Sequence, residues 1–439
     1  MTAAKGAKTL RLGIAGLGTV GGGLLKLIER QSELRLPGKL VVTAVSARSK
    51  SRNRGIDISK FRWVDDPVEL ATADDVDVVV ELIGGSDGPA KRTVETALKA
   101  GKPVVSANKA LIAEHGLEIA ALAEANNAHL LFEAAVAGAV PIVRAIRNSL
   151  SGVVVSRVSG ILNGTCNYIL SEMLRTGAAY ETVLSEAQRL GYAESDPYLD
   201  VSGMDAAHKV LILASIAFGA RPDFSQVQVE GVSEIEAMDI TLANKFDYRI
   251  KLVAEAFRAP KNKDGDGVRC RVAPVLVQKE HPLAQVNGPL NAVMVEGEPV
   301  GRLTFTGPGA GAGPTAAAVM GDLARLFEGP ATPPLGKPAK DLAAIITAAN
   351  GVADQGSFFI GAKLADKPGV FAALTEELAE AGVSIDKLIQ ESAGDTGAAP
   401  VAIMTHPCPR AAIEKALAKV AELKITADAP RLLRIETRA

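Results

Sequence analysis

The sequence contains few cysteines, three among 439 residues. Cys166, Cys270 and Cys408 stand far apart, which excludes the dense disulfide framework of small secreted domains. None of them belongs to a CxxC pair or to a cluster with histidine, so their spacing does not indicate a zinc site. We therefore expect three reduced thiols in a cytoplasmic protein.

The sequence also lacks a long apolar segment and an excess of charge of either sign. Its longest strongly apolar run extends from Val210 to Ala220, well short of the ~20 residues that span a bilayer. The N-terminus has no apolar segment of signal-peptide length before the first expected strand. Lys and Arg total 48 and Asp and Glu total 50, whereas binding to nucleic acid or to an anionic membrane favours a basic excess. We expect neither partner, and the pattern is typical of a cytoplasmic enzyme.

What the sequence does contain is a large apolar fraction and unevenly placed glycine. Its 439 residues suggest about three domains, and 48% hydrophobic residues are enough for a sizeable core. The 42 glycines gather near the N-terminus, around 84–88 and at 307–313. Clustered glycine in such a chain indicates places where the backbone approaches another group closely.

Strand and helix patterns alternate through residues 1–145. The segments between the strands repeat apolar residues at helical spacing, and the strands themselves are rich in Val, Ile and Leu. This alternation predicts an α/β domain with a doubly wound parallel sheet that helices cover on both faces. The expected strands are 9–15, 40–46, 77–85, 103–109 and 129–136.

The rest of the chain predicts two further domains. Residues 146–304 combine helices, including one from Met204 to about Phe218, with several strands, which fits an α+β domain. A Pro/Gly-rich linker follows at 328–340. Residues 350–439 have the order strand, helix, strand, strand, helix, strand, which is that of a ferredoxin-like fold.

A GxGxxG motif lies where the first expected strand meets the first helix. Gly16 permits the tight turn, Gly18 lets the backbone approach a pyrophosphate, and Gly21 allows the helix to pack closely on the strand. Thr19 and Val20 start the helix, whose free N–H groups suit phosphate oxygens. A glycine-rich structural turn is the alternative, but the βαβ context favours a dinucleotide and a Rossmann-type domain.

The loop after the second expected strand bears on the choice of dinucleotide. An acidic residue there would bind the ribose hydroxyls of NAD, whereas a basic residue would bind the 2′-phosphate of NADP. After Ser46 the loop contains four basic residues and no acid, and Arg48 is the best placed of them. NADP is favoured, with NAD or a merely solvated charged loop as alternatives.

Charged residues at two further places suggest chemistry. Lys109 lies at the carboxyl edge of the sheet, where open α/β folds bind ligands. Asp205 and Lys209, four residues apart, share a face of a helix that continues into the apolar run, and buried charges must be paired or used. Together with the nearby carboxylates Glu194 and Asp200, they suit a substrate that bears an ammonium group. The alternatives are a surface lysine at a strand end and an ordinary surface ion pair.

Seven longer motifs give these residues a common context: GLGTVGGG (16–23), ELIGG followed by PA (81–90), SANKALIA (106–113), GILNGTCNYIL (160–170), GYAESDP (191–197), MDAAHK (204–209) and GAGAGPTA (309–316). Through them the chain resembles, over essentially its whole length, the homoserine dehydrogenases that carry a C-terminal ACT regulatory domain. No aspartate kinase segment accompanies the motifs, so the resemblance is to the monofunctional form. It implies interconversion of L-homoserine and L-aspartate-4-semialdehyde with NADP, in threonine, methionine and isoleucine biosynthesis.

The resemblance also implies roles for the charged residues. Lys209 is the acid/base lysine, and Lys109 is a second catalytic lysine near the nicotinamide. Because the neighbouring carboxylates favour the ammonium form of Lys209, we expect oxidation to be fastest at alkaline pH. The implied substrate-binding residues are Glu194 and Asp205, which bind the amino group, with Asp200 close by. Gly191, at the start of the motif GYAESDP, is implied as well.

A monovalent cation, typically sodium, is implied as well, held largely by backbone oxygens around Glu133, Val136, Gly138 and Val140. From the residues alone, Glu133 would be a carboxylate in an apolar strand that a local donor satisfies. The motif at 309–316 implies that the chain returns to the nucleotide domain, with Gly309 against the cofactor. Residues 305–335 would then complete that domain.

The C-terminal segment DKPGVFAALTEELAEAGVSIDKL (366–388) resembles an ACT domain. ACT domains pair side by side and bind amino acids at the interface, so the resemblance implies a homodimer or homotetramer with L-threonine as feedback effector. A domain that only holds the oligomer together is the alternative. The family often has threonine at the position of Cys166, and a partly exposed thiol there would be open to oxidation.

Two other functions stay open on sequence grounds. An amino-acid dehydrogenase would act on a keto acid and depend on ammonia. A non-catalytic amino-acid sensor with a nucleotide fold would lack Lys209 or Glu194, and this chain has both.

Overall fold

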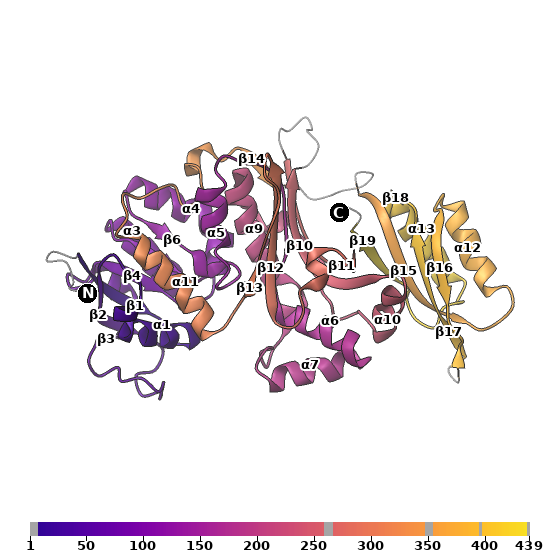
Figure 1. Ribbon diagram of the computed structural model, residues 1–439, viewed down its shortest axis with the longest axis horizontal. Helices are drawn as coiled ribbons and strands as arrows, with labels where there is room; N and C mark the ends of the chain where they lie inside the picture. Colours follow the sequence, from indigo (N-terminus) through magenta and orange to yellow (C-terminus); the bar gives the residue numbers. More distant parts are fainter. Residues whose placement is uncertain (1–7, 259–266, 347–353, 395–396, 437–439) are drawn as a thin grey trace.

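The computed structural model describes residues 8–258, 267–346, 354–394 and 397–436. They form an elongated molecule whose N-terminal, middle and C-terminal parts follow one another along its long axis (Figure 1). Within these ranges, no helix combines the length and the apolar character needed to cross a membrane.

The N-terminal part contains a six-stranded sheet in which every neighbouring pair of strands is parallel. Its order is β3-β2-β1-β4-β5-β6, so the chain reverses its direction of travel across the sheet between β1 and β4. This confirms the predicted doubly wound sheet. The strands are β1 (Thr9–Ala15), β2 (Lys39–Ser46), β3 (Arg62–Val64), β4 (Val78–Glu81), β5 (Val104–Ser106) and β6 (Leu130–Leu131).

Alternate residues of these strands face two different layers of helices. On β4, Val78 and Val80 belong to the core that includes side chains of α1 and α11, whereas Val79 belongs to the core with α3 and α4. Although α11 follows residue 300, it lies beside α1 (Figure 1). The helices are α1 (Thr19–Glu29), α2 (Val68–Thr72), α3 (Pro89–Lys99), α4 (Lys109–Ala125) and α11 (Ala312–Arg325).

Three expected strands differ from those observed. The strand predicted over 103–109 is only Val104–Ser106, because Asn108 caps α4 and Lys109 is the first residue of that helix. The strand predicted over 77–85 ends with β4 at Glu81, because Gly84 and Gly85 have φ angles of +86° and +84° and turn the chain away. The strand predicted over 129–136 is wrong for most of its length. Only Leu130–Leu131 pairs with β5, and the 3₁₀ turn η2 (Glu133–Ala135) follows. A short apolar run fits a strand or a helical turn equally well.

The middle part is built on five long antiparallel strands in the order β13-β12-β7-β10-β11. They are β7 (Val154–Ile161), β10 (Tyr248–Arg258), β11 (Gly267–Gln278), β12 (Leu290–Glu298) and β13 (Gly301–Pro308). The predicted helix at 204–218 is α9 (Met204–Phe218), which packs against β7, β10 and β11. The other helices are α6 (Gly164–Thr176), α7 (Tyr180–Arg189), α8 (Tyr198–Val201) and α10 (Ala237–Lys245).

Several short elements connect these parts. The helical ones are η1 (Gln31–Glu33), α5 (Ile142–Arg144), η3 (Ala145–Ser149), η4 (Phe224–Gln226), η5 (Pro282–Gln285) and η6 (Ala339–Asp341). The short strands are β8 (Ala220–Arg221), β9 (Gln228–Val229) and β14 (Ala344–Ile346).

The C-terminal part has the predicted ferredoxin-like order, with the sheet order β19-β15-β17-β16. Its strand β19 pairs in parallel with β11, so the middle and C-terminal sheets are continuous. Of the expected range 350–439, residues 350–353, 395–396 and 437–439 lie outside the described residues. The elements are β15 (Gln355–Ala365), α12 (Val370–Glu380), β16 (Ile385–Gln390), β17 (Ala398–Thr405), β18 (Cys408–Pro409), α13 (Arg410–Glu422) and β19 (Arg431–Ile435).

Candidate active site

The glycine turn between β1 and α1 is tight at two positions and open at the third. Gly16 has a φ of +108°, and a Cβ there would lie 2.4 Å from the carbonyl oxygen of Leu82. A Cβ on Gly21 would lie 2.2 Å from the carbonyl oxygen of Gly16. Around Gly18, in contrast, no described atom comes within 4 Å of such a Cβ. The start of α1 at Thr19 is therefore open to a phosphate group.

The glycine cluster at 307–313 lies directly against the cluster near the N-terminus. A Cβ on Gly23 of α1 would lie 2.5 Å from the carbonyl oxygen of Ala312, the first residue of α11. A Cβ on Gly138 would lie 2.6 Å from the carbonyl carbon of Gly309. Segments from both halves of the chain thus meet at the carboxyl edge of the parallel sheet, with Val20 partly buried between the sheet and solvent.

The basic loop after β2 is fastened to the glycine turn by one of its arginines. The Nε of Arg54 donates to the carbonyl oxygen of Leu17 at 3.1 Å, and its Nη1 donates to that of Arg52 at 2.8 Å. Arg48, Lys50 and Arg52 are exposed around this clamp. The side chains available for a ribose phosphate are therefore positively charged.

A buried carboxylate joins the loop after β4 to the start of α4. Glu81 accepts hydrogen bonds from the hydroxyl of Ser106 at 2.6 Å and from the N–H of Ile83 at 2.7 Å. Burial raises the pKa of Glu81, and these hydrogen bonds act against that rise. Asn108, which caps α4, lies 3.4 Å from the same carboxylate. This network fixes the position of Lys109, the first residue of α4.

Lys109 and Lys209 meet on the two oxygens of one carboxylate. Asp205 Oδ1 lies 2.7 Å from Lys109 Nζ, and Asp205 Oδ2 lies 2.7 Å from Lys209 Nζ. Lys209 also donates to the carbonyl oxygen of Leu162 at 2.8 Å. Asp205 and Lys209 are buried, whereas 43% of the Lys109 side chain is exposed. The predicted pair of Asp205 and Lys209 on α9 is therefore extended to a triad by Lys109 from α4.

The environment shifts the pKa values of this triad in different directions. Burial lowers the pKa of Lys209 and outweighs the opposing effect of Asp205, while Lys109 lowers it further. The charge of Asp205 raises the pKa of Lys109. Burial alone would raise the pKa of Asp205, but the two ammonium groups hold it below its usual range. Lys209 is thus a buried lysine that gives up its proton more readily than a free one, beside a firmly ionised carboxylate.

Two polar residues beside the triad escaped the sequence reasoning. Asn163 donates from Nδ2 to Asp200 Oδ1 at 2.9 Å and to Asp205 Oδ2 at 3.0 Å. Thr165 Oγ1 lies 3.3 Å from Asp200 Oδ2. Both residues are buried at the start of α6, and Asp200 lies on the short helix α8. The sequence signal that could have indicated them is their position, as polar residues directly after the apolar strand β7.

Glu194 and Gly191 occupy the exposed connection between α7 and α8. The carboxylate of Glu194 acts on Lys109 through its charge, which contributes to the raised pKa of that lysine. Gly191 has a φ of +77°, so the turn at the start of this segment suits glycine. The structure therefore brings Asp200 and Asp205 to the lysines more closely than Glu194.

Glu133 is engaged by local donors. Its two carboxylate oxygens accept the N–H groups of Val143 and Arg144, each at 2.9 Å, at the start of α5. Burial raises the pKa of Glu133, and these contacts act against that rise. Local donors therefore satisfy the carboxylate, as expected from the residues alone. Glu133 itself, however, lies in a 3₁₀ turn and not in a strand.

The loop after Glu133 turns sharply at the carboxyl edge of the parallel sheet, where Gly138 meets Gly309. Ala137 and Gly138 have consecutive φ angles of +54° and +52°, and Val136 and Val140 are buried on either side of them. Within this loop the carbonyl oxygens of Ala137 and Val140 accept the N–H groups of Val140 and Ile142, at 3.0 and 2.8 Å. Carbonyl oxygens are suitable ligands for a hard cation.

The thiol of Cys166 is fully buried, so the premise of a partly exposed, oxidisable group is wrong. Its Sγ lies 3.2 Å from the carbonyl oxygen of Asp200. Burial raises the pKa of this thiol well above the usual value, which keeps it protonated and unreactive.

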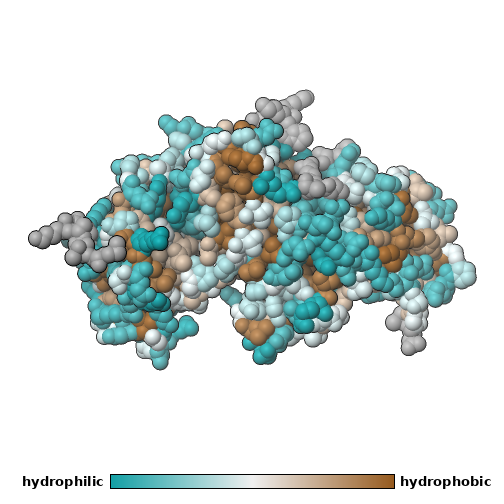
Figure 2. Space-filling view, viewed as in Figure 1, coloured by the Kyte–Doolittle hydropathy of each residue, from teal (hydrophilic) through white to brown (hydrophobic). Residues whose placement is uncertain are grey.

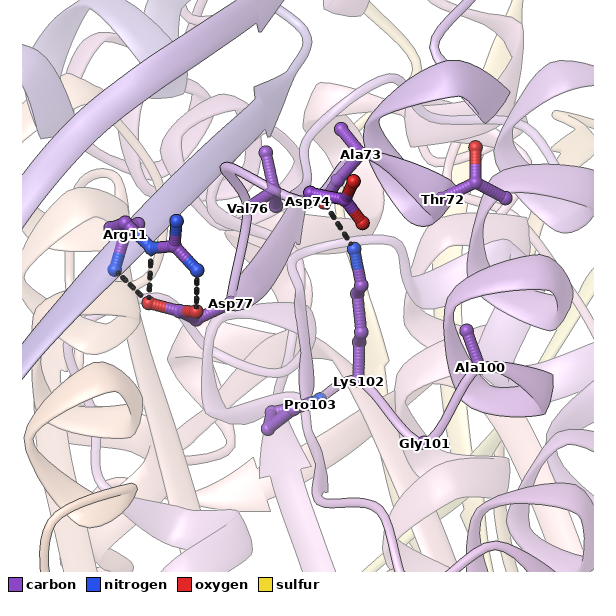
Figure 3. A pocket seen from close by; sticks show the side chains of 10 residues that line it. All are labelled: Arg11, Thr72, Ala73, Asp74, Val76, Asp77, Ala100, Gly101, Lys102 and Pro103. Carbon is purple, nitrogen blue, oxygen red and sulfur yellow. Dashed lines mark hydrogen bonds and ion pairs between the residues drawn. The ribbon is translucent and has the colours of Figure 1, made fainter.

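A pocket of about 540 Å³ lies at the opposite edge of the parallel sheet (Figure 3). Three of its charged side chains already bind one another or the backbone. Arg11 donates to Asp77, and Lys102 donates to the carbonyl oxygen of Ala73 at 2.6 Å. Open α/β sheets bind ligands at the carboxyl ends of their strands, where the lysine triad lies, and this pocket adjoins the amino ends.

Comparison with known families accounts for this arrangement. Models described as "Homoserine dehydrogenase, NAD binding domain", "Homoserine dehydrogenase" and "ACT domain" match residues 16–133, 141–324 and 358–424. A homoserine dehydrogenase of Neisseria gonorrhoeae is 40% identical over 440 residues, which cover 98% of this chain and 99% of that one. The chain belongs to the homoserine dehydrogenase family. It is accordingly an NAD(P)-dependent oxidoreductase that acts on a CH–OH group, with a C-terminal ACT domain.

Solved homoserine dehydrogenases have the same architecture. The structure from Thiobacillus denitrificans superposes with a TM-score of 0.87 at 37% identity and covers 98% of both chains. A hyperthermophilic archaeal homoserine dehydrogenase in complex with NADPH has a TM-score of 0.62 at 25% identity, over 74% of this chain and 99% of that one.

Proposed function

We propose that Lys209 is the proton donor and acceptor in the interconversion of L-homoserine and L-aspartate-4-semialdehyde, with Lys109 and Asp205 setting its charge. The contact of both lysines with Asp205 carries this proposal. The nicotinamide cofactor, when bound, supplies or accepts the hydride. In reduction, Lys209 as ammonium donates a proton to the developing alkoxide. In oxidation, neutral Lys209 takes the hydroxyl proton, and its lowered pKa favours this step.

Carboxylates beside the lysines suit the substrate ammonium group. Asp200 lies 3.3 Å or less from Thr165 and Asn163, and Glu194 stands on the exposed loop above. We assign the amino group to Glu194, Asp200 and Asp205, with Gly191 shaping the loop. Because Asp205 also binds both lysines, it would connect substrate binding with proton transfer.

NADP is the proposed cofactor, at the edge formed by Gly16, Gly18, Thr19, Val20, Gly21 and Gly309, with Lys109 near the nicotinamide. Three exposed basic side chains after β2 support NADP over NAD, and an archaeal relative has been solved with NADPH. Arg48→Ala should raise the KM for NADPH several-fold and leave that for NADH unchanged. An equal effect on both cofactors would contradict the assignment of Arg48.

A sodium ion is the proposed partner of the loop from Glu133 to Val140. The sharp turn at Ala137 and Gly138 and the occupied carboxylate of Glu133 support backbone ligands. Replacing sodium by tetramethylammonium at constant ionic strength should lower activity and the melting temperature. Identical behaviour in the two salts would contradict this site.

L-Threonine is the proposed effector of the ACT domain, and a homodimer or homotetramer is the proposed assembly. β13 is an edge strand of the large sheet, and the exposed apolar side chains Val154, Leu290 and Val300 lie near it. Figure 2 shows separate apolar patches on an otherwise largely hydrophilic face. Threonine that changes neither rate nor melting temperature would contradict regulation, and a monomer in light scattering would contradict assembly.

Biosynthesis of threonine, methionine and isoleucine is the proposed pathway, in the cytoplasm, where the three buried free cysteines would stay reduced. The deciding assay is oxidation of NADPH with aspartate semialdehyde, which we expect to proceed without ammonia. Turnover of a keto acid with ammonia in its place would favour an amino-acid dehydrogenase. No turnover of either substrate would favour a sensor.

A further inference from the structure

Asn163 lies buried at the turn from β7 into α6, and its amide oxygen and nitrogen bind different partners. Its Oδ1 accepts the N–H of Cys166 at 2.8 Å and so caps α6. Because that oxygen faces a donor, Nδ2 must face the other way. There it donates to Asp200 and Asp205, at 2.9 and 3.0 Å. The helix cap thus determines that a donor, not an acceptor, faces the two carboxylates.

Asp205 needs that donor to hold its orientation. Its Oδ1 pairs with Lys109, and its Oδ2 receives both Lys209 and Asn163. Long lysine side chains can follow a carboxylate that rotates, whereas the amide of Asn163 is fixed by its cap on α6. The neighbouring residue Leu162 holds Lys209 through its carbonyl oxygen. Two consecutive residues of one turn therefore contact both members of the Asp205–Lys209 pair.

We propose that Asn163 is a positioning residue for the dehydrogenase reaction, which holds Asp205 in the orientation that bridges Lys109 and Lys209 and ties Asp200 to it. The proposal rests on the proposed role of Lys209. A neutral donor between two carboxylates offsets their mutual repulsion without adding a charge. The net charge of the two ammonium groups and Asp205 therefore stays the same.

The electrostatic surroundings make the proposal measurable. The charged groups that act on Lys209 are Asp205 on the same helix, Lys109 from α4 and Asp200 from α8, and Glu194 acts on Lys109. An aspartate at position 163 would add a carboxylate in contact with Asp205. It would raise the pKa of Lys209, so the pH at which oxidation reaches half its maximal rate would increase.

Two variants separate the donor from the helix cap. Asn163→Asp keeps an oxygen that caps α6 but replaces the donor with an acceptor, and Asn163→Ser keeps a capping hydroxyl that is too short to reach both carboxylates. We expect kcat to fall by about 10²-fold in both, with the KM for NADPH changed less than about two-fold. In the Asp variant, the pH profile of oxidation should shift upward by about one unit.

Asp66→Ala is the control for loss of a capping hydrogen bond, since Asp66 Oδ1 accepts the N–H of Val68 at 3.0 Å at the start of α2, which ends beside the pocket at the amino ends of the strands. It should leave kcat and the pH profile unchanged. The proposal is wrong if either Asn163 variant keeps kcat within about two-fold and its pH profile in place, or if melting temperature and cofactor binding fall in parallel with kcat. Lys209→Ala in the same assay tests the proposed function separately, because its full activity would overturn the role of Lys209 whatever Asn163 does.

Discussion

Arg157 on β7 contacts the carboxylate of Glu436, the residue that follows β19, so a buried ion pair joins the middle sheet to the C-terminal one. The same guanidinium contacts Glu255 on β10, and both Arg157 and Glu255 are buried. The parallel pairing of β11 with β19 lies alongside. The ACT domain is therefore attached to the catalytic part through backbone pairing and through charge.

Glu436→Ala should destabilise the protein by about 2–4 kcal/mol, because it leaves Arg157 with one partner for its buried charge. Denaturant unfolding measures this difference. Glu328→Ala, which breaks the exposed pair with Arg325, is the control and should cost less than about 1 kcal/mol. Equal effects of the two variants would show that the buried pair does not hold the sheets together.

Adjacent glycines in α1 should respond oppositely to alanine. A Cβ on Gly23 overlaps the carbonyl oxygen of Ala312, so Gly23→Ala must push α11 away, at a cost of about 1–3 kcal/mol. For Gly22→Ala the nearest atom is Ile56 Cδ1 at 3.7 Å, and helix propensity favours alanine by about 1 kcal/mol. Thermal melting should therefore fall for the first variant and rise for the second. A rise for both would contradict the close packing of α1 on α11.

Patterns within one element predicted this structure well. The helix Met204–Phe218 and the spacing of Asp205 and Lys209 follow from the 3.6-residue period, which sequence displays directly. The contact of Lys109 with Asp205 did not follow, because it joins residues that are 96 positions apart through the packing of α4 on α9. No local pattern encodes such a contact.

Glu133 illustrates the opposite failure. The apolar run around it is typical of a strand, but the structure has a 3₁₀ turn, because its carboxylate finds donors in Val143 and Arg144. Asn163 was overlooked for a related reason. As a residue type it predicts a helix cap, and its second role arises only once α8 and α9 have folded against α6.

Asp205→Asn should lower kcat by about 10²–10⁴-fold in the reducing direction at neutral pH. The amide cannot offset the burial of Lys209 or the charge of Lys109, so the pKa of Lys209 falls further and its ammonium form is lost. Steady-state rates from pH 6 to 10 measure the effect. Recovery of the reducing rate toward low pH would support this cause, and a loss independent of pH would contradict it.

Lys109→Met should move the pH profile of oxidation upward. Lys109 lowers the pKa of Lys209 through its charge, so its removal leaves Asp205 to favour the ammonium form of Lys209. Oxidation requires neutral Lys209 and should then need a higher pH, while reduction should persist to higher pH. Lys60→Met is the control, because Lys60 is exposed and pairs with Glu29 at the end of α1. An unchanged profile would show that the two lysines titrate independently.

The stability of the protein should depend on Lys251 between pH 8 and 10. Burial lowers the pKa of this lysine to about 8, although its Nζ donates to Val286 at 2.6 Å and to Asn167 at 3.0 Å. A lysine in the unfolded chain has a pKa near 10.4. Between these values the unfolded state binds more protons than the folded state, so this residue adds stability as the pH rises.

Lys251→Met removes that contribution. Relative to the variant, the unchanged protein should gain up to about 3 kcal/mol of unfolding free energy between pH 7 and pH 10.5. Urea unfolding of both proteins at several pH values measures the difference. The hydrogen bonds lost to Val286 and Asn167 lower the stability of the variant at every pH and do not affect the slope. A difference that stays constant with pH would show that Lys251 keeps its proton in the folded state.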